Sequence, residues 1–213
     1  MAILIICDPI VFTKETSMTD KRAKTEIDFK KIPACSGYIV VDPKKCSGCQ
    51  TCMIACSLAH EGKINTKLSR IQVIQDPYGR YPDDLDVHQC RQCVYPKCFV
   101  ACPVAGALVV DTENGNVRRV NKSECNGCQE CIEACPYTPS RIIWNHEEGV
   151  AQKCDLCIDT PHWDETGGPG GKQICVEACP MQAIAFTDKV PTQIEDAGYK
   201  VKLRGEGWPL DKT

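Results

Sequence analysis

Residues 46–56 read Cys46-Ser-Gly-Cys49-Gln-Thr-Cys52-Met-Ile-Ala-Cys56, with two residues between successive members of the first three cysteines and three before the last. Three cysteines at this spacing allow one loop to wrap three corners of an iron–sulfur cubane and to aim its N–H groups at the sulfurs. The fourth cysteine lies on the following helix and points away from that loop. The stretch therefore predicts a [4Fe–4S] site whose fourth ligand comes from elsewhere in the chain.

Groups of four cysteines occur four times along the chain, and the third group repeats the spacing of the first. Sixteen cysteines fall into four groups, which are Cys46, Cys49, Cys52 and Cys56; Cys90, Cys93, Cys98 and Cys102; Cys125, Cys128, Cys131 and Cys135; and Cys154, Cys157, Cys175 and Cys179. A single C-x2-C pair is typical of zinc sites, but four groups of four favour iron–sulfur clusters strongly. The spacing predicts four [4Fe–4S] clusters on these thiolates, with Cys7 and Cys35 left over as spare or buried thiols.

Composition limits the class of protein further. Of 213 residues, 18 are cysteine, 43% are hydrophobic and 25% are charged, a cysteine content typical of disulfide scaffolds, zinc modules or iron–sulfur proteins. The net charge of −3 and the lack of a basic stripe argue against a nucleic-acid partner. The longest apolar run, residues 2–7, is too short to span a bilayer and lacks the features of a signal peptide. We expect a cytoplasmic, reducing location, where extensive disulfide formation is disfavoured.

Between the cysteine groups, short strands alternate with short helices. Apolar and β-branched stretches predict strands over residues 38–42, 70–75, 107–111, 116–120, 141–144 and 149–152, and helical turns over 131–135 and 175–179. Asn114-Gly115 between two of these strands is a hairpin signal. The repeating unit predicts an α+β fold of two tandem ferredoxin-like halves with irregular N- and C-terminal extensions. The expected divisions are an extension at 1–37, a cluster domain at 38–187 and a tail at 188–213.

The four groups, with four residues before the third cysteine of the second group and a long insert in the fourth, resemble the iron–sulfur subunit of dimethyl sulfoxide reductase-type complexes. The resemblance covers residues 38–187 and implies that groups one and four form one half and groups two and three the other. It implies the following ligands: cluster A, Cys46, Cys49, Cys52 and Cys179; cluster B, Cys154, Cys157, Cys175 and Cys56; cluster C, Cys90, Cys93, Cys98 and Cys135; cluster D, Cys125, Cys128, Cys131 and Cys102. The sequence departs from this pattern at Ser57, where the other groups have proline, and in the Gly-rich insert at 166–172.

A narrower resemblance involves the fourth group and the tail. Residues 154–175 and 198–208 look like small subunits that accompany tungsten enzymes of the aldehyde ferredoxin oxidoreductase family, of which class II benzoyl-coenzyme A reductase is one. This resemblance implies a catalytic tungsten or molybdenum oxidoreductase subunit as partner, together with a further electron-input subunit or ferredoxin. We expect both terminal segments to wrap that partner.

The sequence shows no catalytic constellation. No nucleophile–base pair or acid pair stands in a recognisable setting, and Gly167–Lys172 lacks the glycine and Ser/Thr that a phosphate-binding loop requires. His60, His88, His146 and His162 are not spaced as ligands and are interpreted as surface or packing residues, although His88 lies close enough to Cys90 to tune cluster C.

The predicted function is a non-catalytic electron-transfer subunit that relays single electrons between a soluble donor or acceptor and the catalytic subunit of an oxidoreductase complex. Three alternatives remain open. A free polyferredoxin would share every ligand, a zinc scaffold would be colourless, and a subunit docked on a separate membrane anchor would need no span of its own.

Overall fold

The computed structural model describes residues 32–81, 83–163, 168, 172–189, 193–194 and 200–201. The predicted extension up to residue 31 and most of the tail lie outside these residues. In chain order the elements are β1 (Tyr38–Val41), α1 (Thr51–Glu61), the 3-10 turn η2 (Thr66–Leu68), β2 (Ile71–Gln75), β3 (Leu85–Gln89), α2 (Lys97–Ala101), β4 (Leu108–Asp111), β5 (Val117–Val120), α3 (Glu130–Glu133), β6 (Ile142–Asn145), β7 (Val150–Lys153), α4 (Ile174–Glu177), β8 (Ile184–Thr187), β9 (Gln193–Ile194) and β10 (Lys200–Val201). Short helices and antiparallel strand pairs confirm the predicted α+β class.

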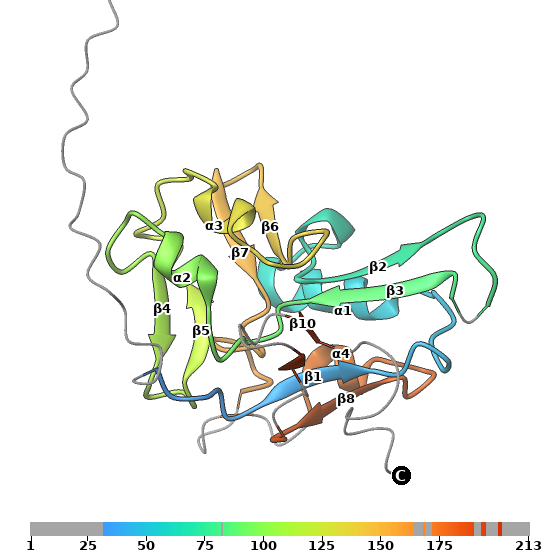
Figure 1. The fold of residues 1–213 in the computed structure, drawn as a ribbon. Coiled ribbons are helices and arrows are strands. Elements are labelled where there is room, and N and C mark those ends of the chain that lie inside the picture. The colour runs from blue at the N-terminus through green and yellow to red at the C-terminus, as the bar shows by residue number, and fades with distance from the viewer. Residues whose placement is uncertain are drawn as a thin grey trace, which may run out of the picture.

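The first half of the molecule joins the two ends of the cysteine-bearing chain. Strand β1 pairs antiparallel with β8, in a register that sets Tyr38 opposite Thr187 and Val41 opposite Ile184. Helix α1 of group one packs against α4 of group four. Figure 1 shows β1, β8, α1 and α4 together, with the β2–β3 hairpin beside them. Group four therefore folds back onto group one across more than a hundred residues of sequence.

The second half is formed by the middle of the chain. Hairpins β4–β5 and β6–β7 follow groups two and three, and α2 packs against α3. In Figure 1 these elements lie on the opposite side of the molecule from the β2–β3 hairpin. Strands β5 and β7 contact each other and so connect the two hairpins. In this half, group two therefore packs with group three.

Helix length follows from the residue after the last cysteine of each group. Helices α2, α3 and α4 span only four or five residues and end before Pro103, Pro136 and Pro180, because proline lacks the N–H that would continue the hydrogen-bond ladder. Helix α1 has Ser57 at that point and continues to Glu61, for a total length of 11 residues. The Ser57 side chain is fully buried, and its hydroxyl donates to Ile54 O at 3.0 Å. The expectation of single helical turns throughout was therefore wrong for group one.

Two apolar clusters form the interior. The larger one contains Tyr38, Ile39, Ile71 and Leu156, together with several cysteines of groups one and four. The smaller one contains Leu108, Ile142 and Ala151 around Cys131. Cysteines are thus part of each core.

Two features complete the fold. The tail was expected to be irregular, but β9 and β10 form a two-residue antiparallel pair within it. None of the described helices is long and apolar enough to cross a membrane.

Candidate iron–sulfur centres

The four cysteine loops share a backbone conformation. The residue immediately before the second cysteine of each group has a positive φ, at Gly48 (69°), Gln92 (48°), Gly127 (75°) and Leu156 (60°). In groups one and four the amide of this residue also bonds to the thiol of the first cysteine. A left-handed residue at this point turns the chain around the sulfurs, and glycine adopts it without a steric penalty. The repeat seen in the sequence is therefore a repeat in backbone geometry.

The thiols of Cys46, Cys49, Cys52 and Cys179 are neighbours. Burial, followed by the charges of Cys46 and Cys179, raises the pKa of Cys52 to about 12. Cys179 is also the strongest charged neighbour of Cys46, ahead of Cys49. These four cysteines are the set expected for cluster A, and they come together because α4 packs on α1.

The set expected for cluster B surrounds a narrow cavity. Cys56, Cys154, Cys157 and Cys175 all line it, with apolar side chains such as Leu156 closing its walls. Burial raises the pKa values of Cys154 and Cys175 well above the ordinary value, and the thiols of the same set raise them further. Metal binding requires deprotonated thiols and so releases these protons.

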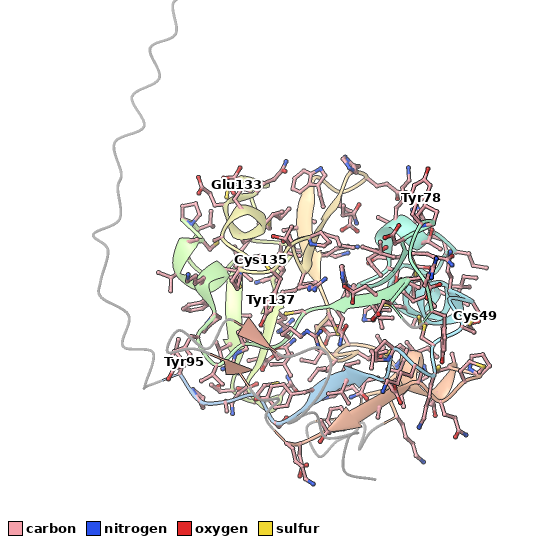
Figure 2. The ribbon with its side chains drawn as sticks, turned by 45° about the vertical axis from the view of Figure 1, so that its right-hand side comes forward. Cys49, Tyr78, Tyr95, Glu133, Cys135 and Tyr137 are labelled. Atoms are coloured by element: carbon pink, nitrogen blue, oxygen red, sulfur yellow. The ribbon has the colours of Figure 1, made fainter. Side chains whose placement is uncertain are left out.

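The sets expected for clusters C and D lie in the second half. Cys98 has Cys90 and Cys135 as its nearest thiol neighbours, and Cys93 has Cys90 and Cys98. The Tyr137 hydroxyl lies 3.9 Å from Cys93 Sγ, and Figure 2 shows Tyr137 close to Cys135. The structure therefore places the last cysteine of group three beside the first three cysteines of group two.

Cluster D has the reciprocal arrangement. The thiols that act on Cys131 include Cys102, Cys125 and Cys128. The thiol of Cys98, in the neighbouring set, also raises the pKa of Cys131, just as the thiol of Cys52 raises the pKa of Cys175. The four sets are thus arranged in two adjacent pairs.

The backbone amides of the residues directly before strands β2, β6 and β8 point at the last cysteines of three groups. The distances are 3.4 Å from Arg70 N to Cys56 Sγ, 3.3 Å from Arg141 N to Cys135 Sγ and 3.3 Å from Ala183 N to Cys179 Sγ. N–H donors to sulfur stabilise the negative charge of a ligated cluster and raise its reduction potential. The strand after each helix therefore contributes to its site as well as to the core.

The residues present fit [4Fe–4S] clusters. Among the described residues no three His, Cys, Asp or Glu side chains form a group that could hold a single metal ion. The ligands of a cubane bind four different iron atoms and therefore lie further apart than the ligands of one ion. The buried Nζ of Lys153 finds no hydrogen-bond acceptor in the described part of the chain, although thiols of group two are its strongest negative neighbours. An anionic cluster at that point would give this ammonium a counter-charge.

Exposure differs between the sites. Cys49 of group one and Cys128 of group three are exposed, whereas Cys157 and Cys175 of cluster B are buried. Cys49 lies at the edge of the molecule in Figure 2. The sets expected for clusters A and D therefore each have an outward-facing cysteine, whereas Cys56, Cys157 and Cys175 of the set expected for cluster B are buried.

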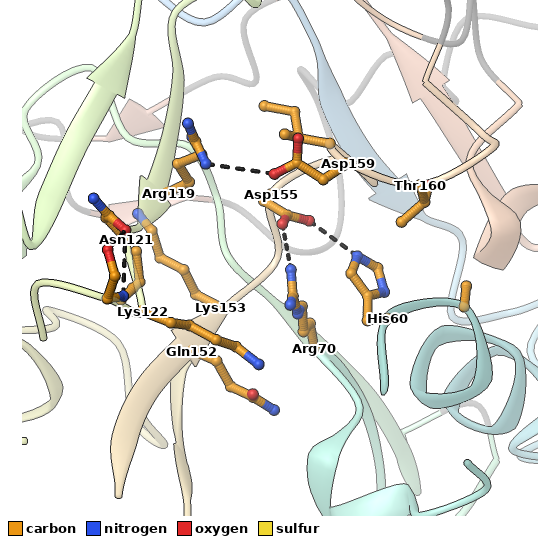
Figure 3. A pocket seen from close by; sticks show the side chains of 14 residues that line it. His60, Arg70, Arg119, Asn121, Lys122, Gln152, Lys153, Asp155, Asp159 and Thr160 are labelled. Atoms are coloured by element: carbon orange, nitrogen blue, oxygen red, sulfur yellow. Dashed lines mark hydrogen bonds and ion pairs between the residues drawn. The ribbon is translucent and has the colours of Figure 1, made fainter. Parts of the chain in front are cut away.

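A network of buried charges lies between the halves, along a cavity of about 270 Å³ (Figure 3). The carboxylate of Asp155 accepts from Arg70 Nη1 and, at 3.1 Å, from His60 Nε2. Burial opposes the charged state of His60, but the hydrogen bond to Asp155 raises its pKa to about 9. His60 Nδ1 donates to Cys56 O at 2.9 Å and lies 3.7 Å from Cys56 Sγ.

The four histidines, which the sequence analysis interpreted as surface or packing residues, have different environments in the structure. His60 is a packing residue, as expected, but it belongs to a charged network that the sequence did not reveal. His88 is buried and bonds to Asp86 at 2.7 Å, and His162 pairs with Glu177 at 3.2 Å. His146 is exposed. The signal for His60 was available, because Ser57 in place of proline allows α1 to continue and carries residue 60 to the same helix face as Cys56.

Lys153 was missed altogether. It is 2% exposed at the end of β7, where all four side chains are buried, so no alternation marked it. Its position directly before Cys154 was the one available hint.

The comparisons with known proteins agree with this geometry. A 4Fe-4S dicluster domain model matches residues 84–189, and a 4Fe-4S binding domain model matches residues 43–62. The chain is 32% identical over 158 residues to the putative electron transport protein YsaA of Escherichia coli (strain K12), covering 71% of this chain and 89% of that protein. The chain belongs to the same family of 4Fe-4S electron-transfer proteins.

Other relatives of the chain are named as subunits of oxidoreductases. It is 39% identical to the polyferredoxin-like subunit of an aliphatic sulfonate oxidoreductase from Pyrococcus furiosus, over 67% of this chain and 70% of the relative. It is 35% identical to the thiosulfate reductase electron transfer subunit PhsB of Salmonella typhi, over 70% of this chain and 74% of the relative. The chain is therefore an iron–sulfur electron-transfer protein with several [4Fe–4S] clusters, which confirms the predicted cofactor and function.

One solved structure is also similar. A chain of the active site complex BamBC of benzoyl coenzyme A reductase with 1,5 dienoyl-CoA matches at a TM-score of 0.39 and 18% identity. The match covers 77% of this chain and 82% of the BamBC chain. A likeness at this level carries no argument about the partner.

Proposed function

We propose that this chain is the non-catalytic electron-transfer subunit of an oxidoreductase complex, with clusters A to D held by the four cysteine sets given above. The observation that carries the proposal is the crossing of the last cysteines, since Cys179 of group four acts on Cys46 and Cys52 of group one. That crossing is the arrangement of a two-cluster ferredoxin. Adjacent sets then lie close enough to form a relay.

Each [4Fe–4S] cluster, when bound, supplies one-electron transfer. The chain's own residues hold the iron through thiolates, donate N–H groups to sulfur and exclude water from the enclosed sites. The outward-facing Cys49 and Cys128 belong to different halves and mark two candidate points of electron entry and exit. Electron transfer by the clusters needs no other reactive group from the described residues.

The proposed partner is a catalytic subunit that contains tungsten or molybdenum, with a further electron-input subunit or ferredoxin on the other side. The resemblance to dimethyl sulfoxide reductase-type complexes supports this partner, and the relatives named as oxidoreductase subunits support an assembly. We place the chain in the cytoplasm as part of this proposal, because the ligand thiols must stay reduced until the clusters assemble.

Purification of the tagged chain from its native host without oxygen tests the partner. The proposal expects size-exclusion chromatography to show a complex larger than the 23.5 kDa chain, with tungsten or molybdenum co-eluting with iron. A free polyferredoxin would elute at the mass of the chain alone, with iron and neither of the other metals. That result would replace the subunit proposal with the alternative.

Serine substitution tests the ligand sets. Cys179→Ser is expected to remove or convert cluster A while leaving cluster B, as seen by iron content and by EPR of the reduced protein. Cys35→Ser is the control, because Cys35 is a free, buried cysteine that belongs to none of the sets. Loss of cluster B in Cys179→Ser, or loss of a cluster in Cys35→Ser, would show that the assignment is wrong.

A further inference from the structure

Lys153 is a charged side chain in the interior without an ordinary partner. It ends β7, is 2% exposed, and its Nζ has no hydrogen-bond acceptor among the described residues. Arg70, by contrast, is also buried but is paired with Asp155 and Glu61. An unpaired ammonium in the interior is costly, so a counter-charge is required.

The groups that face Lys153 identify this counter-charge. The strongest negative influences on its ammonium come from the thiols of Cys90, Cys98 and Cys93. Arg118 also acts on Lys153, with the opposite sign, and its guanidinium donates to Asn116 O and Pro33 O at 2.6 Å each. The cysteines concerned are three of the four ligands proposed for cluster C.

We propose that Lys153 sets the reduction potential of cluster C and makes it the cluster that accepts an electron most readily. One-electron reduction adds one negative charge to a cluster without changing its ligands, and a fixed positive charge nearby stabilises the reduced state. Lys153 is thus a positioning residue for charge and makes no bond to iron. This inference deepens the proposed function and rests on the ligand set assigned to cluster C.

Further buried cations surround the same site. Arg91 and Arg141 are each 6% exposed and act on Cys93 and Cys135 respectively. Asp86 is the acid that faces both of them, and its side chain is 48% exposed. Solvent screens a half-exposed carboxylate, so the balance of charge at cluster C is positive.

The other sites have a different balance. Asp84 acts on Cys46 of cluster A. At cluster B, Arg70 acts on Cys157 and His60 acts on Cys56, but both cations are paired with Asp155, which itself acts on Cys154. The groups that act most strongly on Cys131 of cluster D are other thiols. Cluster C therefore combines the clearest excess of cations with a lysine that has no other counter-charge.

The test is an EPR-monitored redox titration of the full chain, or of its native complex, with dithionite as the one-electron reductant. Lys153→Met removes the charge but keeps the length and apolar stem of the side chain. At a fixed potential we expect the ratio of reduced to oxidised cluster C to fall by about tenfold. For a one-electron couple that is a shift of about 59 mV to more negative potential. Cys135→Ser, which alters a ligand of cluster C, identifies its signal.

Three further variants complete the design. Lys153→Arg keeps the charge and is expected to keep the potential. Lys122 lines the cavity of about 270 Å³ together with Lys153, but it is paired with Glu61 and Glu148. Lys122→Met is therefore expected to leave the reduction potential of every cluster unchanged. Lys153→Gln is a second neutral variant, to be titrated if Lys153→Met fails to retain iron.

The outcomes separate the two levels of the argument. A wild-type protein without four clusters would refute the proposed function. Four clusters with an unchanged cluster C potential in a neutral variant, or an equal shift in Lys122→Met, would refute the role of Lys153 alone. Loss of cluster C in both neutral variants would also overturn it, because Lys153 would then be a structural residue.

Discussion

Arg70 fastens group four to group one, and replacing it with methionine is the most informative test of the packing. Its guanidinium pairs with Asp155 of group four and, at 3.5 Å, with Glu61 of α1. All three side chains are no more than 12% exposed. Arg70→Met keeps the apolar stem but leaves two buried carboxylates with fewer partners. Breaking a buried pair from one side costs about 3–5 kcal/mol.

The lower end of that range is expected, since His60 still donates to Asp155 and Lys122 still pairs with Glu61. In a protein of this size, about 3 kcal/mol lowers the melting temperature by about 6–12 °C. The assay is anaerobic thermal unfolding at one fixed scan rate, followed by cluster absorbance and far-ultraviolet circular dichroism, because cluster loss makes unfolding irreversible.

Lys63→Met is the matched control. Lys63 pairs with Glu147, but the two side chains are 49% and 48% exposed, and such pairs contribute about 0–1 kcal/mol. We expect a decrease of less than about 4 °C for this variant. A decrease for Arg70→Met no larger than that for Lys63→Met would refute the claim that this network fastens group four to group one.

Three further predictions concern the local structure. Ser57→Pro should end α1 early at a cost of about 3 kcal/mol, and hydrogen exchange should show residues 58–61 losing protection; unchanged protection would contradict our account of helix length. Ile142→Ala, at a core position 4% exposed, should lower the free energy of unfolding by about 2–5 kcal/mol, whereas Ile74→Ala, at 42% exposure, should have little effect; equal losses in denaturant titrations would be inconsistent with the core described here. Gly127→Ala should cost the protein cluster D, because a Cβ there would lie 2.5 Å from Gly149 O, while Gly149→Ala, also at positive φ, meets nothing within 4 Å; iron analysis of the two variants would reveal the difference, and equal iron contents would count against it.

Much of the local structure could be predicted because cysteine spacing and hairpin signals act over short distances. Strands β1, β4, β5 and β7 lie within about a residue of their predicted bounds, and Asn114-Gly115 lies between β4 and β5 as expected. Strand β3 was not predicted, because Leu85–Gln89 alternates only weakly and merges into group two.

The charged interior could not be predicted for a different reason. Polar residues such as Lys153 and Asp155 are ordinarily exposed, and their burial depends on contacts between groups far apart in the sequence. Nothing in local pattern showed that residue 60 would meet residue 155, because the contact depends on α1 continuing past Ser57 and on group four folding back. Resemblance to a family supplied the pairing of the groups, and tertiary packing supplied the charges around them.

Iron and acid-labile sulfide analysis of the full chain, purified without oxygen, tests the central claim most directly. The four cysteine sets predict about sixteen iron atoms and about sixteen sulfides per chain, with zinc near zero. About eight iron atoms would mean that half of the proposed sites are not clusters. Zinc in place of iron would contradict the electron-transfer account as a whole.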